Sequence, residues 1–293
     1  MEGGACDAAW ARSSSPLQRE HALLRAEQDN SPRPPKGPVE SDAVMKLSLL
    51  LFILYALVLT VALIRKAPRR KTANPITRGW GNRIRILIIG ATGGTGQQLV
   101  RQALDIGHEV TALVRTPTKL QIEHPNLRVI KGNVLDYSSI ESAMQKQNAV
   151  VCALGHKRWF YPNQILSDGT RNVLRAMEAC GVPRLVCESS LGLGNSTGRL
   201  GLLGTFVFVP LILPFIFSDK IRQEKLIEES DVDWVIVRPA MLTNSAARGK
   251  YRHGRNVGNF IVTRRISRAD VADFTLKQLT NDSYIGSAVG VCW

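Results

Sequence analysis

The sequence predicts an α/β protein: a doubly wound parallel sheet with helices on both faces, preceded by one N-terminal transmembrane helix. Three observations lead to this prediction. From residue 83 onward, short apolar runs alternate with helical stretches, which is typical of a parallel sheet covered on both faces. Three glycines spaced three apart, Gly90, Gly93 and Gly96, follow the first run. Upstream, Leu47 to Ile64 contains 18 residues without a charge.

The composition is that of a globular chain with appendages. Of the 293 residues, 44% are hydrophobic and 21% are charged, which suits one domain of about 200 residues. The net charge is +14, but eight positive charges and no acid fall between residues 65 and 85. One basic belt of this kind is attracted to anionic lipid, and it argues against a nucleic-acid-binding face spread over the fold.

The first 82 residues are expected to form a tail, an anchor and a linker. Residues 1–44 are rich in Ser, Pro, Arg and Glu and are expected to be disordered. Residues 45–65 are predicted to be a membrane anchor, because the apolar run would form a helix of about 27 Å, close to the thickness of the hydrocarbon core. A cleaved signal peptide is the alternative, and Met45 is an alternative start. The basic linker at 66–82 predicts a single-pass protein whose main domain, 83–293, faces the cytoplasm.

The elements of that domain follow in order. Strands are expected at 84–89, 108–115, 127–132, 149–155, 184–190 and 233–239. Helices are expected at 94–104, 138–147, 168–181, 218–230 and 268–279. Gly181 and Pro183 end the third helix, because glycine is favoured just past a helix and proline cannot continue one. Ser267 and Asp270 give the last helix a start that is similar to a capping box.

The glycine triplet predicts a dinucleotide site. In a strand-turn-helix unit, Gly90 permits a tight turn, Gly93 lets the backbone approach a ligand, and Gly96 lets the helix lie against the sheet. The free N–H groups at the start of that helix favour an anion, most naturally a pyrophosphate. A purely structural turn is the alternative.

The second strand indicates which dinucleotide is bound. NAD-binding proteins usually place an acid about 20 residues after the glycines to bond the ribose hydroxyls. Here the strand ends in Arg115, whose guanidinium would attract a 2′-phosphate and can bond it in two places. NADPH is therefore the predicted cofactor, and a solvated charge is the alternative explanation for Arg115.

Six stretches carry a family resemblance: GATGGTGQ, LVRTPTKL, VIKGNVLD, DGTRNVLRAMEACGVPRLV, DWVIVRPAM and ISRADVADFTLKQL. With them, residues 83–293 resemble the atypical short-chain dehydrogenases/reductases with an NAD(P)H-binding NmrA-like domain, nearest to the flavin reductase and biliverdin-IXβ reductase type. The resemblance implies a Rossmann-like fold and contacts to the pyrophosphate, 2′-phosphate, adenine, ribose and nicotinamide. The resemblance implies pyrophosphate contacts from Gly90, Thr92, Gly93, Gly94, Thr95 and Gly96, and 2′-phosphate contacts from Arg115 and Lys119. It also implies that Asn133 and Val134 touch the adenine, that Leu154 and Gly155 line the path of the ribose, and that Pro239 and Met241 border the nicotinamide.

Departures from the family concern the reaction. Ordinary short-chain dehydrogenases place a tyrosine acid four residues before a lysine. Lys220 fits the lysine position, but residue 216 is Ile, and Met241 stands where the nearest branch tends to carry His. Direct hydride transfer needs orientation more than a tyrosine. Ser190, expected to face the nicotinamide, and Lys220 are the predicted catalytic residues; a strand-end hydroxyl bonded to backbone and a solvated first-turn lysine are the alternatives.

A second uncharged run, Leu200 to Phe217, separates the fifth and sixth strands. It cannot be a simple span, because both strands belong to one sheet and Pro210 and Pro214 interrupt a straight helix. The segment at 200–217 is a buried lid, a dimer contact or a membrane-dipping loop. Membrane contact is favoured and would open the site toward lipophilic acceptors.

Two functional classes follow. The first is a membrane-anchored NADPH-dependent oxidoreductase that passes hydride to a flavin, quinone or other hydrophobic acceptor. The second is a non-catalytic NADP(H)-binding redox sensor or an assembly factor for a membrane complex. The expected partners are the lipid bilayer and a small hydrophobic acceptor, with a homodimer left open and no nucleic acid. The five cysteines lack disulfide-framework or zinc-site spacing, so free buried thiols and no metal are expected.

Overall fold

The structure is a computed structural model that describes residues 83–155, 164–212 and 214–293, together with positions 46, 48–50, 52, 53 and 55. It divides into two units, residues 1–56 and 57–293. The described positions of the first unit are helical. The fold below is that of the second unit.

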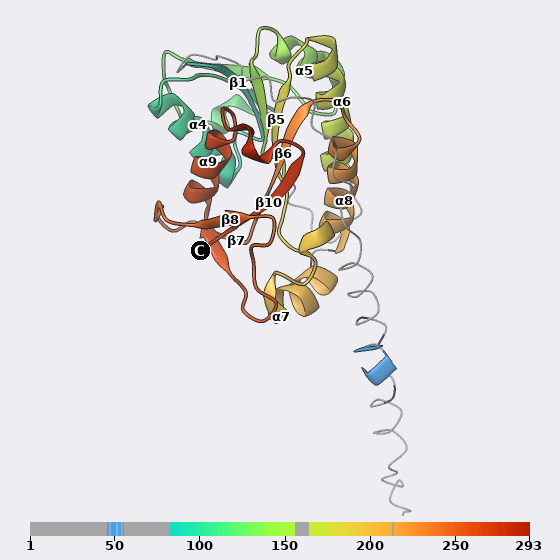
Figure 1. Ribbon diagram of the computed structural model, residues 1–293. Coiled ribbons are helices and arrows are strands. Elements are labelled where there is room, and N and C mark those ends of the chain that lie inside the picture. Colours follow the sequence, from blue (N-terminus) through green and yellow to red (C-terminus); the bar gives the residue numbers. More distant parts are fainter. Residues whose placement is uncertain are drawn as a thin grey trace, which may run out of the picture. The chain divides into compact units, whose positions relative to one another are not determined.

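An eight-stranded sheet forms the centre of the second unit (Figure 1). Its order is β3-β2-β1-β4-β5-β6-β10-β8, and every neighbouring pair is parallel except β10 with β8. The strands are β1 (Arg85–Ile89), β2 (Glu109–Val114), β3 (Leu127–Lys131), β4 (Ala149–Cys152), β5 (Arg184–Glu188), β6 (Asp233–Pro239), β8 (Arg252–Gly254) and β10 (Ser287–Cys292). The chain winds outward from β1 in both directions, which confirms the predicted Rossmann-like, doubly wound sheet.

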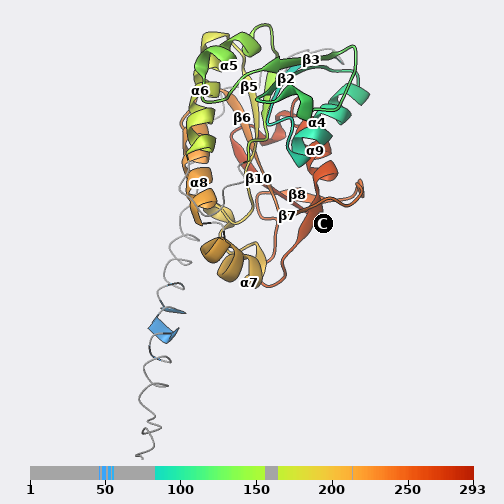
Figure 2. The ribbon, with the colours of Figure 1, turned by 180° about the vertical axis from the view of Figure 1, so that it is seen from behind.

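Helices cover both faces of the sheet, and Figure 2 shows the same two layers from behind. One layer holds α4 (Gly94–Asp105) and α9 (Arg268–Lys277), and the other holds α5 (Tyr137–Met144), α6 (Ile165–Ala179) and α8 (Pro214–Glu228). Alternate residues of β1 serve the two layers: Ile86 and Ile88 join one buried cluster, and Leu87 and Ile89 join the other. This two-sided burial explains why the strand reads as a continuous apolar run.

The predicted strands and helices are all present, with shifted ends. Helix α6 begins at Ile165 because the Asp219 carboxylate, on α8, accepts hydrogen bonds from the backbone N–H groups of Leu166 (2.9 Å) and Ser167 (3.2 Å). A carboxylate supplied by another helix leaves no local signal. Capping of α9 by Ser267 is confirmed, because its hydroxyl accepts from the Asp270 N–H at 3.0 Å.

Several short elements near the C-terminus were not predicted. Besides β8 and β10 they include β7 (Met241–Thr243) and β9 (Arg265–Ser267), which pair with each other in a separate two-stranded sheet. Strand β10 extends the main sheet by pairing with β6. Strands β7, β8 and β9 have three residues each, too few to show a periodic pattern, whereas the six-residue β10 was simply missed.

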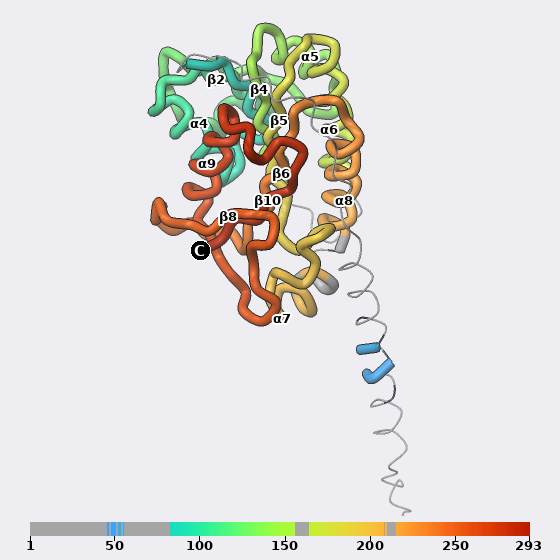
Figure 3. Tube along the Cα trace, in the orientation of Figure 1, coloured from blue at the N-terminus to red at the C-terminus, as the bar shows by residue number. Residues whose placement is uncertain are grey.

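Most of the described residues between 200 and 217 are helical, and some of their side chains are exposed. Figure 3 follows the chain from β5 through α7 (Gly201–Leu203) and the π-helix η3 (Gly204–Ile212) into α8. Leu200 and Phe217 join the core, whereas Leu202 and Phe206 are exposed, so the segment is not a fully buried lid.

No helix among the described residues is both long enough and apolar enough to cross a bilayer. The expected tail at 1–44, the linker at 66–82 and most of the anchor at 45–65 lie outside the described residues.

Candidate functional site

The turn between β1 and α4 requires its glycines. Gly90 has a φ of +86°, and a Cβ there would lie 2.3 Å from the Ala153 carbonyl oxygen. A Cβ on Gly96 would lie 2.1 Å from the Gly90 oxygen, and the Gly93 N–H donates to that same oxygen at 2.9 Å. These contacts confirm the backbone roles expected for Gly90 and Gly96. Because the turn is closed by backbone alone, it leaves the first N–H groups of α4 for an anion.

Arg268 lies against the start of α4. A Cβ on Gly94 would lie 2.6 Å from the Cδ and Nε atoms of Arg268, so any other residue there would require the arginine side chain to shift. The Arg268 Nη1 donates to the Asn244 Oδ1 at 2.6 Å. A guanidinium is thereby held at the helix terminus where a diphosphate is expected. Arg268 could not be predicted as a site residue from the sequence, because α9 lies far from α4 along the chain.

A buried carboxyl reaches the same turn from β5. Glu188 is the last residue of β5 and is 8% exposed, and its Oε1 accepts a hydrogen bond from the Thr95 Oγ1 at 3.1 Å. Burial raises the pKa of Glu188, and the positive charges of Lys220 and Arg268 and the Thr95 hydrogen bond partly offset that rise. Glu188 was not among the predicted site residues, although its place at a strand's carboxyl end was a usable signal.

Lys220 belongs to this cluster. Its positive charge acts on Glu188 and on the thiols of Cys152 and Cys187, so α8 brings the lysine close to the carboxyl ends of β4 and β5. The alternative of a solvated first-turn lysine is wrong, because α8 begins at Pro214 and the side chain is half-buried in the second turn. Ile216 precedes it on the same helix, so no tyrosine stands there.

The structure favours Ser189 as the serine that contacts a ligand, whereas the sequence indicated its neighbour Ser190. Strand β5 ends at Glu188, two residues earlier than expected. The Ser190 hydroxyl donates to the Leu191 carbonyl at 3.2 Å, as in the alternative explanation of a strand-end hydroxyl. Ser189 is 4% exposed, and its Oγ has no hydrogen-bond partner among the described residues. Because an unpaired buried hydroxyl is costly, Ser189 is the better candidate to contact a ligand.

The other expected cofactor residues lie just past, or at, the carboxyl ends of their strands. Arg115 and Lys119 are exposed after β2, and neither makes an ion pair with the described part of the chain. The remaining positions are the exposed Asn133 and buried Val134 after β3, the half-buried Leu154 and exposed Gly155 after β4, the buried Pro239 at the end of β6, and the half-buried Met241 in β7. Parallel strands end at one edge of a sheet, so these residues share the edge that carries the glycine turn.

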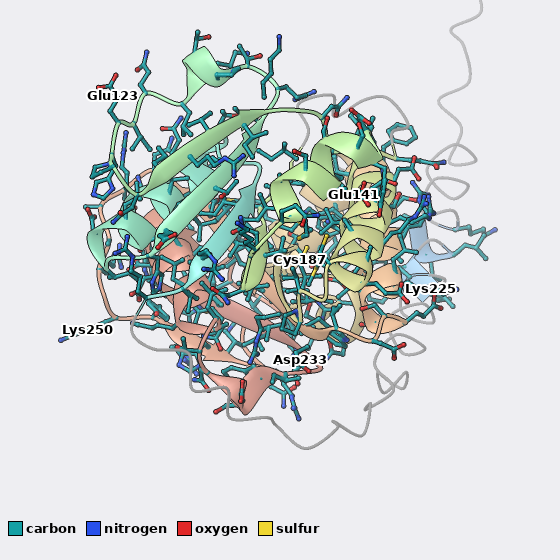
Figure 4. All side chains as sticks on the ribbon, turned by 90° about the horizontal axis from the view of Figure 1, so that it is seen from above. Glu123, Glu141, Cys187, Lys225, Asp233 and Lys250 are labelled. Carbon is teal, nitrogen blue, oxygen red and sulfur yellow. The ribbon has the colours of Figure 1, made fainter. Side chains whose placement is uncertain are left out.

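The thiols beneath this edge are structural. Cys152 and Cys187 are directly opposite each other on β4 and β5, and both are fully buried. Hydrogen bonding with Cys152, together with burial, raises the pKa of the Cys187 thiol. Figure 4 shows Cys187 inside the fold, whereas Lys225 and Lys250 project outward. Free thiols were expected and are confirmed for four described cysteines. Within the described ranges, no group of His, Cys, Asp or Glu could hold a metal ion.

A buried ion pair holds the far side of the site. Arg238 on β6 donates to both carboxylate oxygens of Glu224 on α8, at 2.9 and 2.7 Å, and a third bond of 2.5 Å reaches the Asn195 Oδ1. Both charged side chains are almost completely buried. The pair therefore joins β6, α8 and the segment after β5 into one framework.

These features define the class of protein. The family model described as NAD(P)H-binding matches residues 90–282, and the chain belongs to this family. A nicotinamide coenzyme fits the residues present, because Gly90, Gly93 and Gly96 carry no Cβ at the turn and the Arg268 guanidinium lies beside it.

Individual relatives agree with this class. The chain is similar to an uncharacterized chloroplastic protein of Arabidopsis thaliana, 29% identical over 56% of this chain and 61% of that protein. It is also similar to the photosystem II assembly factor Ycf39 of Synechocystis, 31% identical over 37% of this chain and 34% of that factor. The chain thus spans less than two thirds of these relatives.

Solved structures agree as well. A Rossmann-fold NAD(P)-binding family protein from Shigella flexneri is 27% identical, with a TM-score of 0.54 over 71% of this chain and 92% of that one. The anaerobilin reductase ChuY of Escherichia coli O157:H7 shares the fold, with 24% identity and a TM-score of 0.58 over 71% of this chain and 96% of that one. The resemblance inferred from the sequence motifs is confirmed.

Proposed function

We propose that this chain is a membrane-anchored, NADPH-dependent oxidoreductase that passes hydride to a flavin, quinone or other hydrophobic acceptor. One observation carries the proposal. The edge of the sheet that carries the glycine turn also holds the buried Glu188, the adjacent buried Ser189 and the half-buried Lys220, whose positive charge acts on Glu188. Such a cluster beside a cofactor turn is typical of an active site.

The bound coenzyme supplies a hydride from its nicotinamide ring. The turn from Gly90 to Gly96 and the Arg268 guanidinium would hold the diphosphate. The Ser189 hydroxyl is free to donate a hydrogen bond to a ligand oxygen, and Lys220 offers a positive charge to ribose or acceptor oxygens. Since residue 216 is not a tyrosine, the proton that accompanies the hydride must come from another group. Glu188 is suited to hold it on its carboxyl, because burial raises its pKa.

The preference for NADPH rests on two exposed cations. Arg115 and Lys119 follow β2, where the 2′-phosphate of a bound coenzyme is expected. Neither is paired with an acid in the described chain, so both are free to bond a phosphate.

The membrane anchor rests on the sequence. The uncharged run from Leu47 to Ile64 and the basic belt after it support one span with the coenzyme domain on the cytoplasmic side. Anchoring keeps the domain at a lipid surface, where a hydrophobic acceptor is concentrated.

A second candidate function is coenzyme binding without turnover, in a redox sensor or an assembly factor for a membrane complex. The similarity to Ycf39, whose name describes an assembly factor, favours it, as does the absence of the tyrosine. This role needs the glycine turn and Arg115 but not Lys220.

NADPH oxidation by the purified, detergent-solubilised full chain separates the candidates. The acceptors are FMN, FAD, menadione and a short-chain ubiquinone, and calorimetry measures NADPH and NADP⁺ binding in parallel. Turnover supports the oxidoreductase, and tight binding without turnover supports the sensor or assembly factor. If neither form of the coenzyme binds, both proposals fail.

A further inference from the structure

Exposed apolar side chains gather on one surface of the domain. Seven large ones come from α7, η3 and the loop between β8 and β9, with exposed fractions from 38% for Val207 to 70% for Ile261. We call this set the apolar surface; its members are Leu202, Leu203, Phe206, Val207, Phe260, Ile261 and Val262. Isolated exposed apolar residues are common, but a contiguous group of this size marks a contact surface.

The two segments of the apolar surface lie side by side, although over fifty residues separate them in the chain. The Leu202 N–H donates to the Ile261 carbonyl at 3.1 Å, and Leu200 forms a bridge with Asn259. Gly201 adopts a φ of +82°, and a Cβ there would lie 2.5 Å from the Thr263 nitrogen. Figures 1 and 2 both show the β8–β9 loop beside α7, away from α5. Backbone contacts therefore hold the surface together as one unit.

The two stretches of chain that carry this surface contain basic residues and no acid, although one of those bases, Arg238, is buried in its pair with Glu224. Ser189 to Ser218 contains no acid, and Arg199 is its single charge. The Arg199 guanidinium lies 5.2 Å from the centre of the Phe260 ring. Trp234 to Ala269 also contains no acid, and its basic residues are Arg238, Arg248, Lys250, Arg252, Arg255, Arg264, Arg265 and Arg268. Apolar side chains flanked by arginines without acids complement a bilayer that carries anionic headgroups.

We propose that the apolar surface docks into an anionic lipid surface, with Arg199, Arg264 and Arg265 bonding lipid phosphates at its margin. A second copy of the chain suits the surface less well. In a two-fold symmetric contact the same patch faces itself, so arginines of both copies would meet with no carboxylate between them.

Docking would orient the candidate site toward the membrane. The segment with α7 follows the carboxyl end of β5, and the loop with Phe260 lies downstream of the carboxyl end of β6. Glu188 and Ser189 lie at the same edge. An acceptor dissolved in the bilayer would then reach the site without crossing water. This consequence rests on the proposed function, whereas the docking itself does not.

Photolabelling of the full chain in vesicles tests the docking. The vesicles contain phosphatidylcholine, with or without phosphatidylserine, and a phosphatidylcholine that carries a diazirine on its acyl chain. Trypsin then yields peptides 200–220 and 256–264, one for each segment of the surface, and peptide 47–65 for the anchor. We expect lipid label on peptides 200–220 and 256–264, and more of it when phosphatidylserine is present.

Matched variants sharpen the result. Ile261→Ser with Val262→Ser, or Arg264→Glu with Arg265→Glu, should lower labelling of peptide 200–220 about tenfold. The control is Ile221→Ser, which removes an apolar side chain that is 55% exposed on α8 but lies outside the surface. Unchanged NADPH affinity shows that each variant is folded.

Other outcomes overturn the docking. Label confined to peptide 47–65 shows that only the anchor meets lipid. Protein–protein cross-links between two copies of these peptides, without lipid label, identify a dimer contact instead. If the amount of lipid label is the same with and without phosphatidylserine, the arginines do not bind anionic headgroups. If the wild-type chain carries the lipid label on these peptides but does not oxidise NADPH, the proposed oxidoreductase function is refuted and the docking is not.

Discussion

The two halves of the sheet's carboxyl edge are built differently. In the β1–β4 half, the glycine turn is fixed by close backbone contacts, of Gly96 with Gly90 within the turn and of Gly90 with Ala153 just past β4. In the β5–β10 half, where the acceptor is proposed to bind, hydrogen bonds join segments that are far apart in the chain. Examples are the Arg238 side chain with that of Glu224 and the Leu202 N–H with the Ile261 carbonyl. The coenzyme half therefore depends on close backbone packing that only glycine permits, and the proposed acceptor half depends on side-chain and backbone bonds between distant segments.

The largest effect is expected from Gly96→Val in the coenzyme half. The added side chain would overlap the Gly90 carbonyl, because even a Cβ would lie 2.1 Å from it. We expect a loss of about 4 kcal/mol or more in unfolding free energy, together with loss of NADPH binding. Chemical denaturation and calorimetry measure both. Gly107→Ala is the control: its φ is +89° but nothing lies within 4 Å, so it should cost only about 1 kcal/mol. Equal effects would contradict the steric explanation.

Glu224→Ala tests the acceptor half. The substitution would leave the Arg238 guanidinium buried without its bidentate partner. We expect the free energy of unfolding, measured by chemical denaturation, to fall by about 3–5 kcal/mol. The matched change is Glu229→Ala, just past the end of α8, which breaks the exposed 3.8 Å pair with Lys225 and should cost less than about 1 kcal/mol. If both variants unfold alike, the buried pair does not hold the framework.

Within the acceptor half, Lys220→Ala and Ser189→Ala should lower NADPH turnover about 10²-fold while NADPH affinity changes little. Ser190→Ala should leave turnover near the wild-type value, because that hydroxyl already bonds the Leu191 carbonyl. Steady-state kinetics with the best acceptor of the panel measures all three. A larger loss from Ser190→Ala than from Ser189→Ala would restore the assignment made from the sequence.

Arg115→Asp should shift the coenzyme preference from NADPH toward NADH. A carboxylate at this position would repel the 2′-phosphate of NADPH and could bond the ribose hydroxyls of NADH. We expect NADPH affinity to fall about 10- to 100-fold and NADH affinity to rise or hold, as measured by titration calorimetry. Unchanged NADPH affinity would show that Arg115 is only a solvated charge.

The smallest effect concerns pH. Burial raises the pKa of Glu188 above its value in the unfolded chain, so the folded state binds the proton more tightly. The stability that this provides is complete below the unfolded pKa and is lost as pH rises through the folded pKa. Glu188→Gln should therefore melt closer to, or above, the wild type as pH increases, by thermal unfolding across a pH series. A difference in melting temperature that does not change with pH would contradict a raised pKa.

The same contrast explains what the sequence could predict. The glycine turn and the doubly wound parallel sheet follow from local patterns, and the structure agrees with both; the role of Lys220 came from the family resemblance and stays a prediction. Ser189 was missed because the choice between adjacent serines depends on where β5 ends, and sequence patterns define strand ends poorly. Arg268 was missed because its contact with Gly94 exists only after α9 packs on α4.

The carboxylate of Asp219 has a mechanical consequence. It is fully buried on α8, it is the immediate neighbour of Lys220, and it caps the first turn of α6. The position of the Lys220 ammonium group therefore depends on α6, although α6 supplies none of the candidate site residues. A ligand or substitution that tilts the start of α6 is therefore expected to displace Lys220 through the Asp219 carboxylate.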